Sequence, residues 1–282
     1  MQKTILITGC SSGIGLSAAQ TLQKRGYRVF ATTRKEADVE KLKAQGLESL
    51  RLDVDDSESI HNAFNEILQR TGGTLDALFN NAGFGLPGAV EDLTRDMIRS
   101  QFETNVFGTI ELTNLALPVM RKQGHGRIIM NTSMLGTVAF PYYGAYNASK
   151  FALEGFSNTL RIELRGTPIF VSIIAPGPIT SRFRDNALKT YHETLENKPS
   201  EHLENYKKIE KNYSEPPSKS EQKVTLGPDA VTQKLILALE SRKPKAHYNV
   251  TVPSHLFAFL RRVLPDSALD WAISLAAGAE KK

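Results

Sequence analysis

The chain has 282 residues, of which 40% are hydrophobic and 23% are charged, and its formal net charge is +5. This length and balance predict one large folded domain and exclude wholesale disorder. The basic residues are spread along the chain, so we expect no nucleic-acid surface. The single cysteine, Cys10, excludes an internal disulfide, and no signal peptide or bilayer-spanning stretch is apparent, so we expect a cytoplasmic protein.

Short β-prone runs alternate with helical patterns through residue 174. The expected strands cover residues 4–8, 27–33, 47–52, 75–79, 127–131 and 168–174. The expected helices cover residues 14–24, 37–44, 57–69, 94–120 and 145–165. This alternation predicts an α/β fold, a single Rossmann-type doubly wound parallel sheet with helices on both faces.

The composition changes between residues 181 and 226, where charged residues are frequent and large apolar ones are few. Segments of this kind are usually lids or disordered inserts, so we interpret this one as a substrate lid made of loops. Regular structure is expected again as a helix at 230–239 and a last strand at 247–252. No second domain boundary is apparent, so a single domain is expected over residues 1–282.

A glycine-rich turn, Thr8-Gly9-Cys10-Ser11-Ser12-Gly13-Ile14-Gly15, lies between the first expected strand and the first expected helix. Glycines let the backbone approach a pyrophosphate, and the helix N-terminus stabilises its charge. The same residues also fit the G-x-S-x-G elbow of a serine hydrolase, with Ser11 as nucleophile. A hydrolase elbow comes later in the sheet order, however, and five of the histidines are expected in loops or the tail without an acid partner: His125, His192, His202, His247 and His255. The nucleotide interpretation is therefore favoured.

The end of the second expected strand, Ala31-Thr32-Thr33-Arg34-Lys35, indicates which dinucleotide is bound. It holds no carboxylate to accept a ribose 2′-hydroxyl, whereas Arg34 can form paired hydrogen bonds to a 2′-phosphate, with Thr33 or Ser12 as hydroxyl donors. We therefore expect NADP(H). The alternative is that Arg34 and Lys35 begin a solvated loop.

The spacing Tyr146-x-x-x-Lys150 places a phenol and an ammonium on one face of a helix. A nearby cation is expected to lower the phenol pKa toward the range useful for an acid. Ser133, at the end of the preceding strand, could hold a substrate oxygen against that phenol. The alternative is an ordinary tyrosine and a solvated lysine.

These motifs together resemble the short-chain dehydrogenase/reductase family through about residue 181. The family's T-G-x-x-x-G-x-G turn is matched at Thr8 to Gly15, and its N-N-A-G stands at Asn80 to Gly83. Its P-G-x-[VI]-x-T segment is matched from Pro176, except that Ser181 replaces the usual threonine. The branch that contains hydroxysteroid and retinol dehydrogenases and bacterial aldehyde reductases is the most similar in its motifs.

The resemblance implies a catalytic set of Asn105, Ser133, Tyr146 and Lys150. It also implies coenzyme contacts from Gly9, Ser11, Ser12, Gly13, Ile14, Gly15, Arg34, Asp53, Asn81, Ala82, Gly83, Tyr146, Lys150, Pro176, Gly177, Ile179 and Ser181. Asp53 could instead cap the helix that follows it. A homo-oligomer is implied as well.

The resemblance implies hydride transfer between nicotinamide and a carbonyl or alcohol carbon. Tyr146 would protonate the developing alkoxide, Ser133 would stabilise that oxygen, Lys150 would bind the nicotinamide ribose, and Asn105 would hold a water next to Lys150. The rival interpretation is an NADP-sensing protein without activity. An intact set of proton-transfer residues argues against it.

The expected substrate pocket is mostly apolar, which predicts a lipophilic aldehyde, retinoid or ketosteroid-like substrate. Its expected contacts are Ser133, Leu135, Phe140, Tyr146 and Phe183. The six histidines show no metal-ligand spacing, so no metal site is expected.

The tail, residues 254–282, is expected to be amphipathic. An apolar run from Leu256 to Leu260 is followed by Arg261 and Arg262, and apolar residues return around Trp271. The tail could contact a membrane surface, or it could pack over the pocket or a partner subunit. Packing on protein is the favoured interpretation.

Overall fold

The computed structural model describes residues 2–216 and 218–278; Met1 and the last four residues of the predicted tail lie outside the described part. Seven parallel strands form one sheet in the order β3-β2-β1-β4-β5-β6-β7. The strands are β1 (Thr4–Ile7), β2 (Arg28–Thr33), β3 (Glu48–Arg51), β4 (Ala77–Asn80), β5 (Gly126–Asn131), β6 (Ile169–Ala175) and β7 (His247–Asn249). The predicted doubly wound sheet is confirmed.

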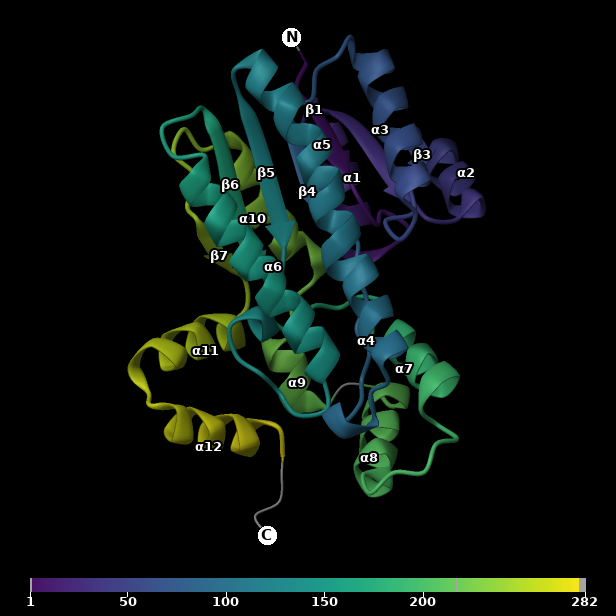
Figure 1. The fold of residues 1–282 in the computed structure, drawn as a ribbon, viewed down its shortest axis with the longest axis vertical. Helices are drawn as coiled ribbons and strands as arrows, with labels where there is room; N and C mark the ends of the chain where they lie inside the picture. Colours follow the sequence, from purple (N-terminus) through teal and green to yellow (C-terminus); the bar gives the residue numbers. More distant parts are fainter. Residues whose placement is uncertain (1, 217, 279–282) are drawn as a thin grey trace.

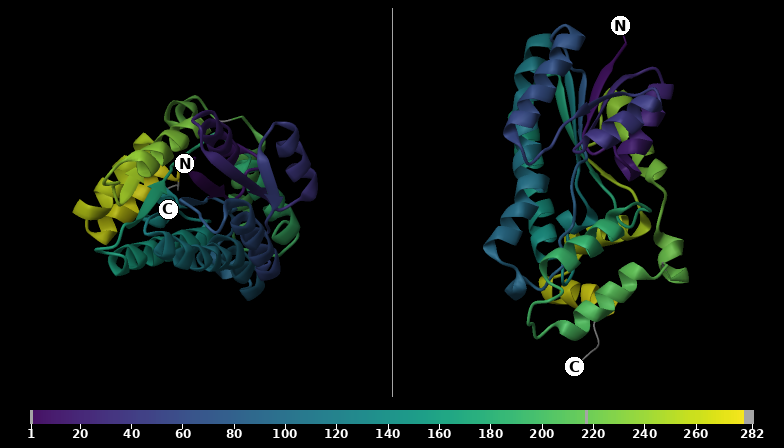
Figure 2. Two further views of the ribbon diagram at one scale, coloured as in Figure 1. Left: turned by 90° about the horizontal axis from the view of Figure 1, so that it is seen from above. Right: turned by 90° about the vertical axis from the view of Figure 1, so that its right-hand side faces the viewer.

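Helices cover both faces of the sheet, as the view from above shows (Figure 2). One face carries α1 (Gly13–Lys24), α2 (Glu36–Ala44) and α10 (Pro228–Glu240), and the other carries α3 (Ser57–Thr71), α5 (Gly108–Gln123) and α6 (Gly144–Glu163). Ile5, Leu6 and Ile7 are all fully buried, because side chains on both faces of a parallel strand lie in a core. The apolar runs of the sequence therefore predicted these strands well.

The strand order reverses between β1 and β4, and ligands of such sheets bind beyond the carboxyl ends of the strands at this point. In Figure 1 these ends point toward the lower half of the molecule, where the helices outside the sheet layers gather. The site described below lies at this edge.

The single helix predicted at 94–120 is wrong. The chain forms α4 (Arg95–Phe102), a π-helical turn from Glu103 to Phe107, and then α5. Such turns often occur at functional sites because they re-aim one side chain within a helix. The turn contains Asn105.

The loops predicted between 181 and 226 are also wrong, because three helices form there: α7 (Phe183–Thr194), α8 (Leu203–Ser214) and α9 (Lys219–Val224). Their few large apolar side chains lie inward, where Tyr191, Leu195 and Tyr206 pack with Leu86 and Ala89. The charged residues face outward. The segment is therefore a small helical layer below the sheet edge (Figure 2).

The tail forms a helical hairpin, α11 (Val252–Val263) and α12 (Asp266–Ala276). The last strand ends at Asn249, earlier than predicted, because Thr251 caps α11 by accepting a hydrogen bond from Ser254 N. The inner face of the hairpin buries Phe257, Leu269 and Ile273 against Val138. The favoured packing of the tail on protein is therefore observed for this face. None of the helices in the described residues combines the length and apolar character that crossing a bilayer requires.

Candidate active site

The glycine turn after β1 is too tight for side chains. Gly9 and Gly13 have φ angles of 72° and 57°, in the left-handed region that favours glycine. A Cβ on Gly9 would lie 2.9 Å from the Cα of Ala82, and one on Gly15 would lie 2.3 Å from the carbonyl oxygen of Gly9. The turn therefore packs directly against the residues that follow β4, and larger residues would not fit at Gly9 or Gly15.

Ser12 is the N-cap residue of α1, and its side chain makes no capping hydrogen bond. The N–H groups of the first turn are therefore open to an anionic ligand, and the helix dipole favours one there. Two further predicted contacts lie in this turn, the exposed Ser11 and the half-buried Ile14.

Hydrogen bonds connect the carboxyl ends of β1, β4 and β5. Thr8 Oγ1 accepts from the backbone N–H groups of Asn81 and Ala82, each at 2.9 Å. Asn81 Nδ2 donates to Thr8 O and Gly9 O, and Asn131 Nδ2 donates to Asn81 Oδ1 at 3.0 Å. The Asn81 side chain therefore connects and stabilises the carboxyl ends of these three strands. Asn131 was missed by the sequence analysis, although its position as a polar residue at a strand end was a usable signal.

Ser133, Tyr146 and Lys150 come together and are all buried. Ser133 follows β5, its Oγ accepts from Leu135 N at 3.1 Å, and its hydroxyl lies near enough to the phenol of Tyr146 to lower the pKa of that phenol. Lys150 Nζ lies 5.7 Å from the centre of the Tyr146 ring and donates to Asn131 O at 3.0 Å. The predicted cluster thus exists as a geometric unit, although the amine is directed at a strand carbonyl.

Burial dominates the electrostatics of this cluster. It raises the pKa of Tyr146 to about 12, and the hydrogen bond to Ser133 opposes this rise. Burial also lowers the pKa of Lys150 to about 8, against the charge of Glu154, which raises it. The expectation that Lys150 brings the phenol pKa below its ordinary value is therefore wrong for the protein alone. Burial removes water from the phenolate, and this destabilises the phenolate more than the neighbouring groups stabilise it.

Asn105 lies in the π-helical turn and is fully buried. Its Oδ1 accepts from Phe84 N, and its Nδ2 donates to Phe84 O and to Ser149 Oγ. A Cβ on Gly83 would lie 3.1 Å from Asn105 Oδ1 and 3.7 Å from Lys150 Nζ, so Asn105 and Lys150 flank this glycine. The structure does not test the water-holding role, which stays a prediction.

The residues expected near the adenosine end lie after β2 and β3. Arg34 is exposed, whereas the hydroxyl of Thr33 donates to Lys35 O. Asp53 is half-buried and does not cap α3, because Asp56 is the N-cap residue of that helix. Asp53 is thus not occupied as a cap, and of the two predicted hydroxyl donors to a 2′-phosphate only Thr33 already donates within the protein.

The segment after β6 returns to the glycine turn. It contains four predicted coenzyme contacts: Pro176, Gly177, Ile179 and Ser181. The Cβ of Ser181 lies 3.1 Å from where a Cβ on Gly13 would stand, and Gly177 is needed because its Cβ would meet Thr251 Oγ1 at 2.2 Å. The carboxyl ends of β1 and β6 therefore border the same space.

Phe183, at the start of α7, lies over the catalytic tyrosine candidate. Its ring centre is 5.3 Å from that of Tyr146, and a Cβ on Gly85 would be 2.5 Å from its edge. Leu135 is half-buried next to Ser133. Phe140 instead packs edge-on against Phe257 of the tail, at 5.3 Å, so it helps to anchor α11. The sequence offered no sign of this distant pairing.

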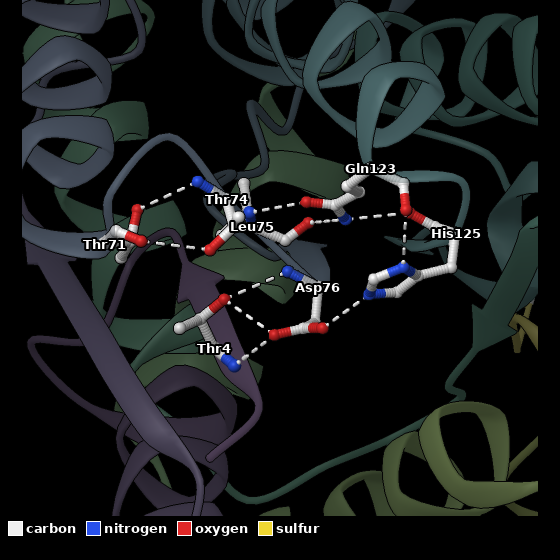
Figure 3. A network of polar contacts seen from close by, with 7 residues as sticks. All are labelled: Thr4, Thr71, Thr74, Leu75, Asp76, Gln123 and His125. Atoms are coloured by element: carbon white, nitrogen blue, oxygen red, sulfur yellow. Dashed lines mark hydrogen bonds and ion pairs between the residues drawn. The ribbon is translucent and has the colours of Figure 1, made fainter. Parts of the chain in front are cut away.

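The hydrolase alternative needs a histidine beside Ser11. His125 does have an acid partner, since its Nε2 lies 2.7 Å from Asp76 Oδ1. This pair joins the network around Thr4, shown in Figure 3. Thr4 begins β1, whereas Ser11 follows the end of that strand, so the pair lies at the opposite edge of the sheet.

The expectation that the histidines lack acid partners is wrong more generally, because the fold joins residues far apart in sequence. The pairs are His125 with Asp76, His192 with Glu196, His202 with Glu91 and His247 with Glu154. His192 also faces Glu210 of α8, and this group of three is the only set of possible metal ligands found among the described residues. Glu196 is exposed and the other two are half-buried, and His192 pairs with each of the two glutamates.

Comparison with known proteins agrees with the arrangement of residues at the carboxyl ends of the strands. The sequence model described as short chain dehydrogenase matches residues 3–192. The chain belongs to the short-chain dehydrogenase/reductase family. The uncharacterized oxidoreductase YbbO of Escherichia coli K12 is 42% identical to this short-chain dehydrogenase/reductase over 270 residues, which cover 96% of this chain and 93% of the relative.

Two further similarities bear on the site of this short-chain dehydrogenase/reductase. Retinol dehydrogenase 8 of Homo sapiens is 39% identical over 196 residues, which cover 66% of this chain and 62% of the relative. A crystal structure of actinorhodin polyketide ketoreductase with NADPH is 26% identical, with a TM-score of 0.72 over 88% of this chain and 95% of that one. The protein is therefore an oxidoreductase of a fold that holds a nicotinamide coenzyme in a similar solved structure.

Proposed function

We propose that this short-chain dehydrogenase/reductase uses NADP(H) to interconvert a lipophilic carbonyl compound and its alcohol. The observation that carries the proposal is the buried cluster of Ser133, Tyr146 and Lys150 beside the glycine turn. The cradle fits a dinucleotide, because Gly9 and Gly13 hold the turn in left-handed conformations and no side chain caps the first N–H groups of α1. The coenzyme, when bound, supplies the hydride.

The residues of the chain handle the proton. Tyr146 is protonated at neutral pH, as burial raises an already high pKa, and its phenol can donate that proton to the more basic oxygen of an alkoxide. The Ser133 hydroxyl lies near the phenol and can turn toward the same oxygen. Lys150, with a pKa of about 8, supplies positive charge next to both.

NADP(H) is favoured over NAD(H) by the end of β2. Arg34 is exposed there and can bind a 2′-phosphate in a bidentate manner, and the segment offers no carboxylate for a 2′-hydroxyl. We expect Arg34→Asp to weaken NADPH binding at least tenfold and to leave NADH binding unchanged or improved, as measured by coenzyme fluorescence.

A lipophilic substrate is favoured by the apolar side chains around Tyr146, namely Phe183 and Leu135. The similarity to a retinol dehydrogenase supports the same substrate class. Medium or long-chain aldehydes, retinoids and ring ketones are the compounds to screen first.

The test is Tyr146→Phe, assayed as NADPH oxidation with a lipophilic aldehyde. We expect turnover to fall at least ~100-fold, because general acid catalysis typically contributes that much, while NADPH binding persists. Tyr27→Phe is the matched control, since Tyr27 lies just before β2 at the opposite edge of the sheet. Near wild-type turnover in Tyr146→Phe would refute the proposal. Coenzyme binding without turnover of any carbonyl in the wild type would favour the NADP-sensing alternative, and ester cleavage lost in Ser11→Ala would favour the hydrolase.

Self-association is a further part of the proposal. Phe107, Phe151 and Ile162 expose apolar surface along the helices of one face of the sheet. Exposed apolar residues of this size favour contact with a second copy. Sedimentation velocity of the wild type should show a dimer or tetramer.

A further inference from the structure

A buried carboxylate lies one helical turn beyond Lys150. The Glu154 side chain is only 10% exposed, and its Oε1 accepts a hydrogen bond from Thr132 Oγ1 at 2.7 Å. The same oxygen lies 3.2 Å from Nε2 of His247, the first residue of β7. A carboxylate is seldom buried without such partners, and neither the sequence motifs nor the proposed proton transfer uses this one.

Three side chains spaced four residues apart on α6 hold the end of β5. Tyr146 lies near Ser133, Lys150 donates to Asn131 O, and Glu154 accepts from Thr132, which lies between Asn131 and Ser133. Glu154 therefore holds the residue that precedes Ser133 in the chain. The backbone at this point also donates from Thr132 N to Ile174 O and from Met134 N to Pro176 O, so loss of the Glu154 bond would shift the Thr132 side chain and not release the strand end.

The close packing around Glu154 leaves the carboxylate little freedom. A Cβ on Gly136 would lie 3.0 Å from Glu154 Cγ, so the short turn after Ser133 packs directly against the Glu154 side chain. Thr132 Oγ1 is also 3.3 Å from Ile174 O of β6. The carboxylate thus sits among β5, β6, β7 and the turn after Ser133.

Electrostatics connects Glu154 with Lys150. Burial lowers the pKa of Lys150 to about 8, and the negative charge of Glu154 raises it against that effect. The groups facing Lys150 from the elements packed on it are Asn131 of β5 and Asn105 of the π-helical turn, and neither is charged. Tyr146, on the same helix, is neutral at physiological pH. His247 faces Glu154 from β7.

We propose that Glu154 is a positioning residue of the active site, acting through Lys150 and through the strand end that carries Ser133. The inference rests on the proposed function, because it assigns Glu154 a part in the same proton transfer. It adds β7 to the elements that set the geometry of the site.

The experiment compares the pH dependence of kcat for Glu154→Gln and the wild type, with NADPH and one aldehyde, between pH 6 and pH 10. Glutamine keeps an acceptor for Thr132 but removes the charge, so Lys150 should lose its proton at a lower pH. We expect the alkaline limb of the profile to move down by about one pH unit. We also expect kcat near pH 8 to fall about tenfold or more, with a smaller change in KM for NADPH.

Glu154→Asp keeps the charge and should hold the alkaline limb at the wild-type pH, even though the shorter side chain lowers kcat by weakening the bond to Thr132. Glu163→Gln, at the exposed end of the same helix, is the matched control and should behave as the wild type. If Glu154→Gln does not fold, a displaced alkaline limb in Glu154→Asp would overturn the inference.

An unchanged kcat profile in folded Glu154→Gln would also overturn it. That failure can be told from failure of the proposed function by Tyr146→Phe in the same assay. An inactive Tyr146→Phe beside an unaffected Glu154→Gln refutes only the role of Glu154, whereas an active Tyr146→Phe refutes the proposed function itself.

Discussion

Gly15→Ala should damage both coenzyme binding and stability. The added Cβ would lie 2.3 Å from the backbone oxygen of Gly9 and 2.7 Å from Nδ2 of Asn81, whereas ordinary contact begins at 3.4 Å. Backbone has to move by about 1 Å, and such overpacking typically costs about 1–3 kcal/mol. The hydrogen bond from Asn81 to Gly9 O would weaken as well, which adds about 1 kcal/mol. We therefore expect a loss of about 2–4 kcal/mol in the free energy of unfolding, or roughly 3–7 °C in Tm.

The same movement displaces the turn that faces the pyrophosphate, so the Kd for NADPH should rise at least tenfold. Calorimetric titration and thermal unfolding measure the two effects. Gly155→Ala is the matched control, because Gly155 lies exposed on α6 with nothing within 4 Å of its added Cβ. Alanine there should raise stability by up to ~1 kcal/mol through helix propensity and leave NADPH binding unchanged. A Gly15→Ala protein with wild-type Tm and a Kd within twofold would refute the argument from close approach.

Two further predictions concern regions away from the glycine turn. Asp76 is partly buried, which raises the pKa of its carboxyl, but hydrogen bonds from Thr4 and His125 outweigh this effect and lower it overall. The ionised Asp76 carboxylate therefore contributes to stability above about pH 4, and this contribution is lost as the pH falls through the lowered pKa. Asp76→Asn should lower the free energy of unfolding in urea by about 1–3 kcal/mol at pH 7 and by less in acid. An equal loss at both pH values would contradict this prediction. On the tail, Leu256 and Phe259 expose apolar surface. The wild type should therefore float with lipid vesicles, and a double variant that carries Leu256→Ser and Phe259→Ser should not. Equal flotation of the two proteins would leave the hairpin with a packing role only.

The sequence predicted those features that are determined within a few residues. The apolar strands, buried on both faces, and the glycines at the first turn have local signals, so the sheet and the coenzyme edge could be inferred. The motif around Tyr146 and Lys150 likewise reflects helical spacing. Each of these depends on side chains that are neighbours along one element.

Other features depend on residues that meet only in the folded chain. The helices between residues 183 and 224 have a charged composition, and the inward side chains that hold them, such as Tyr206, are recognisable only when packed with Leu86. The π-helical turn around Asn105 has no residue signature. The pairing of Phe140 with Phe257 and of Glu154 with His247 links positions roughly a hundred residues apart.

The pKa values of the site also depend on the folded chain and not on the local sequence. The spacing of Tyr146 and Lys150 places the ammonium near the ring, but it does not reveal how much water surrounds either group. Burial moves the two pKa values apart, raising that of Tyr146 to about 12 and lowering that of Lys150 to about 8, and each shift favours the neutral side chain. A phenol that holds its proton this firmly is still a stronger acid than an alcohol, so donation to an alkoxide stays favourable. In the reduction that we propose, the phenol therefore remains able to donate its proton, and the charge of Glu154 helps to keep Lys150 protonated beside it.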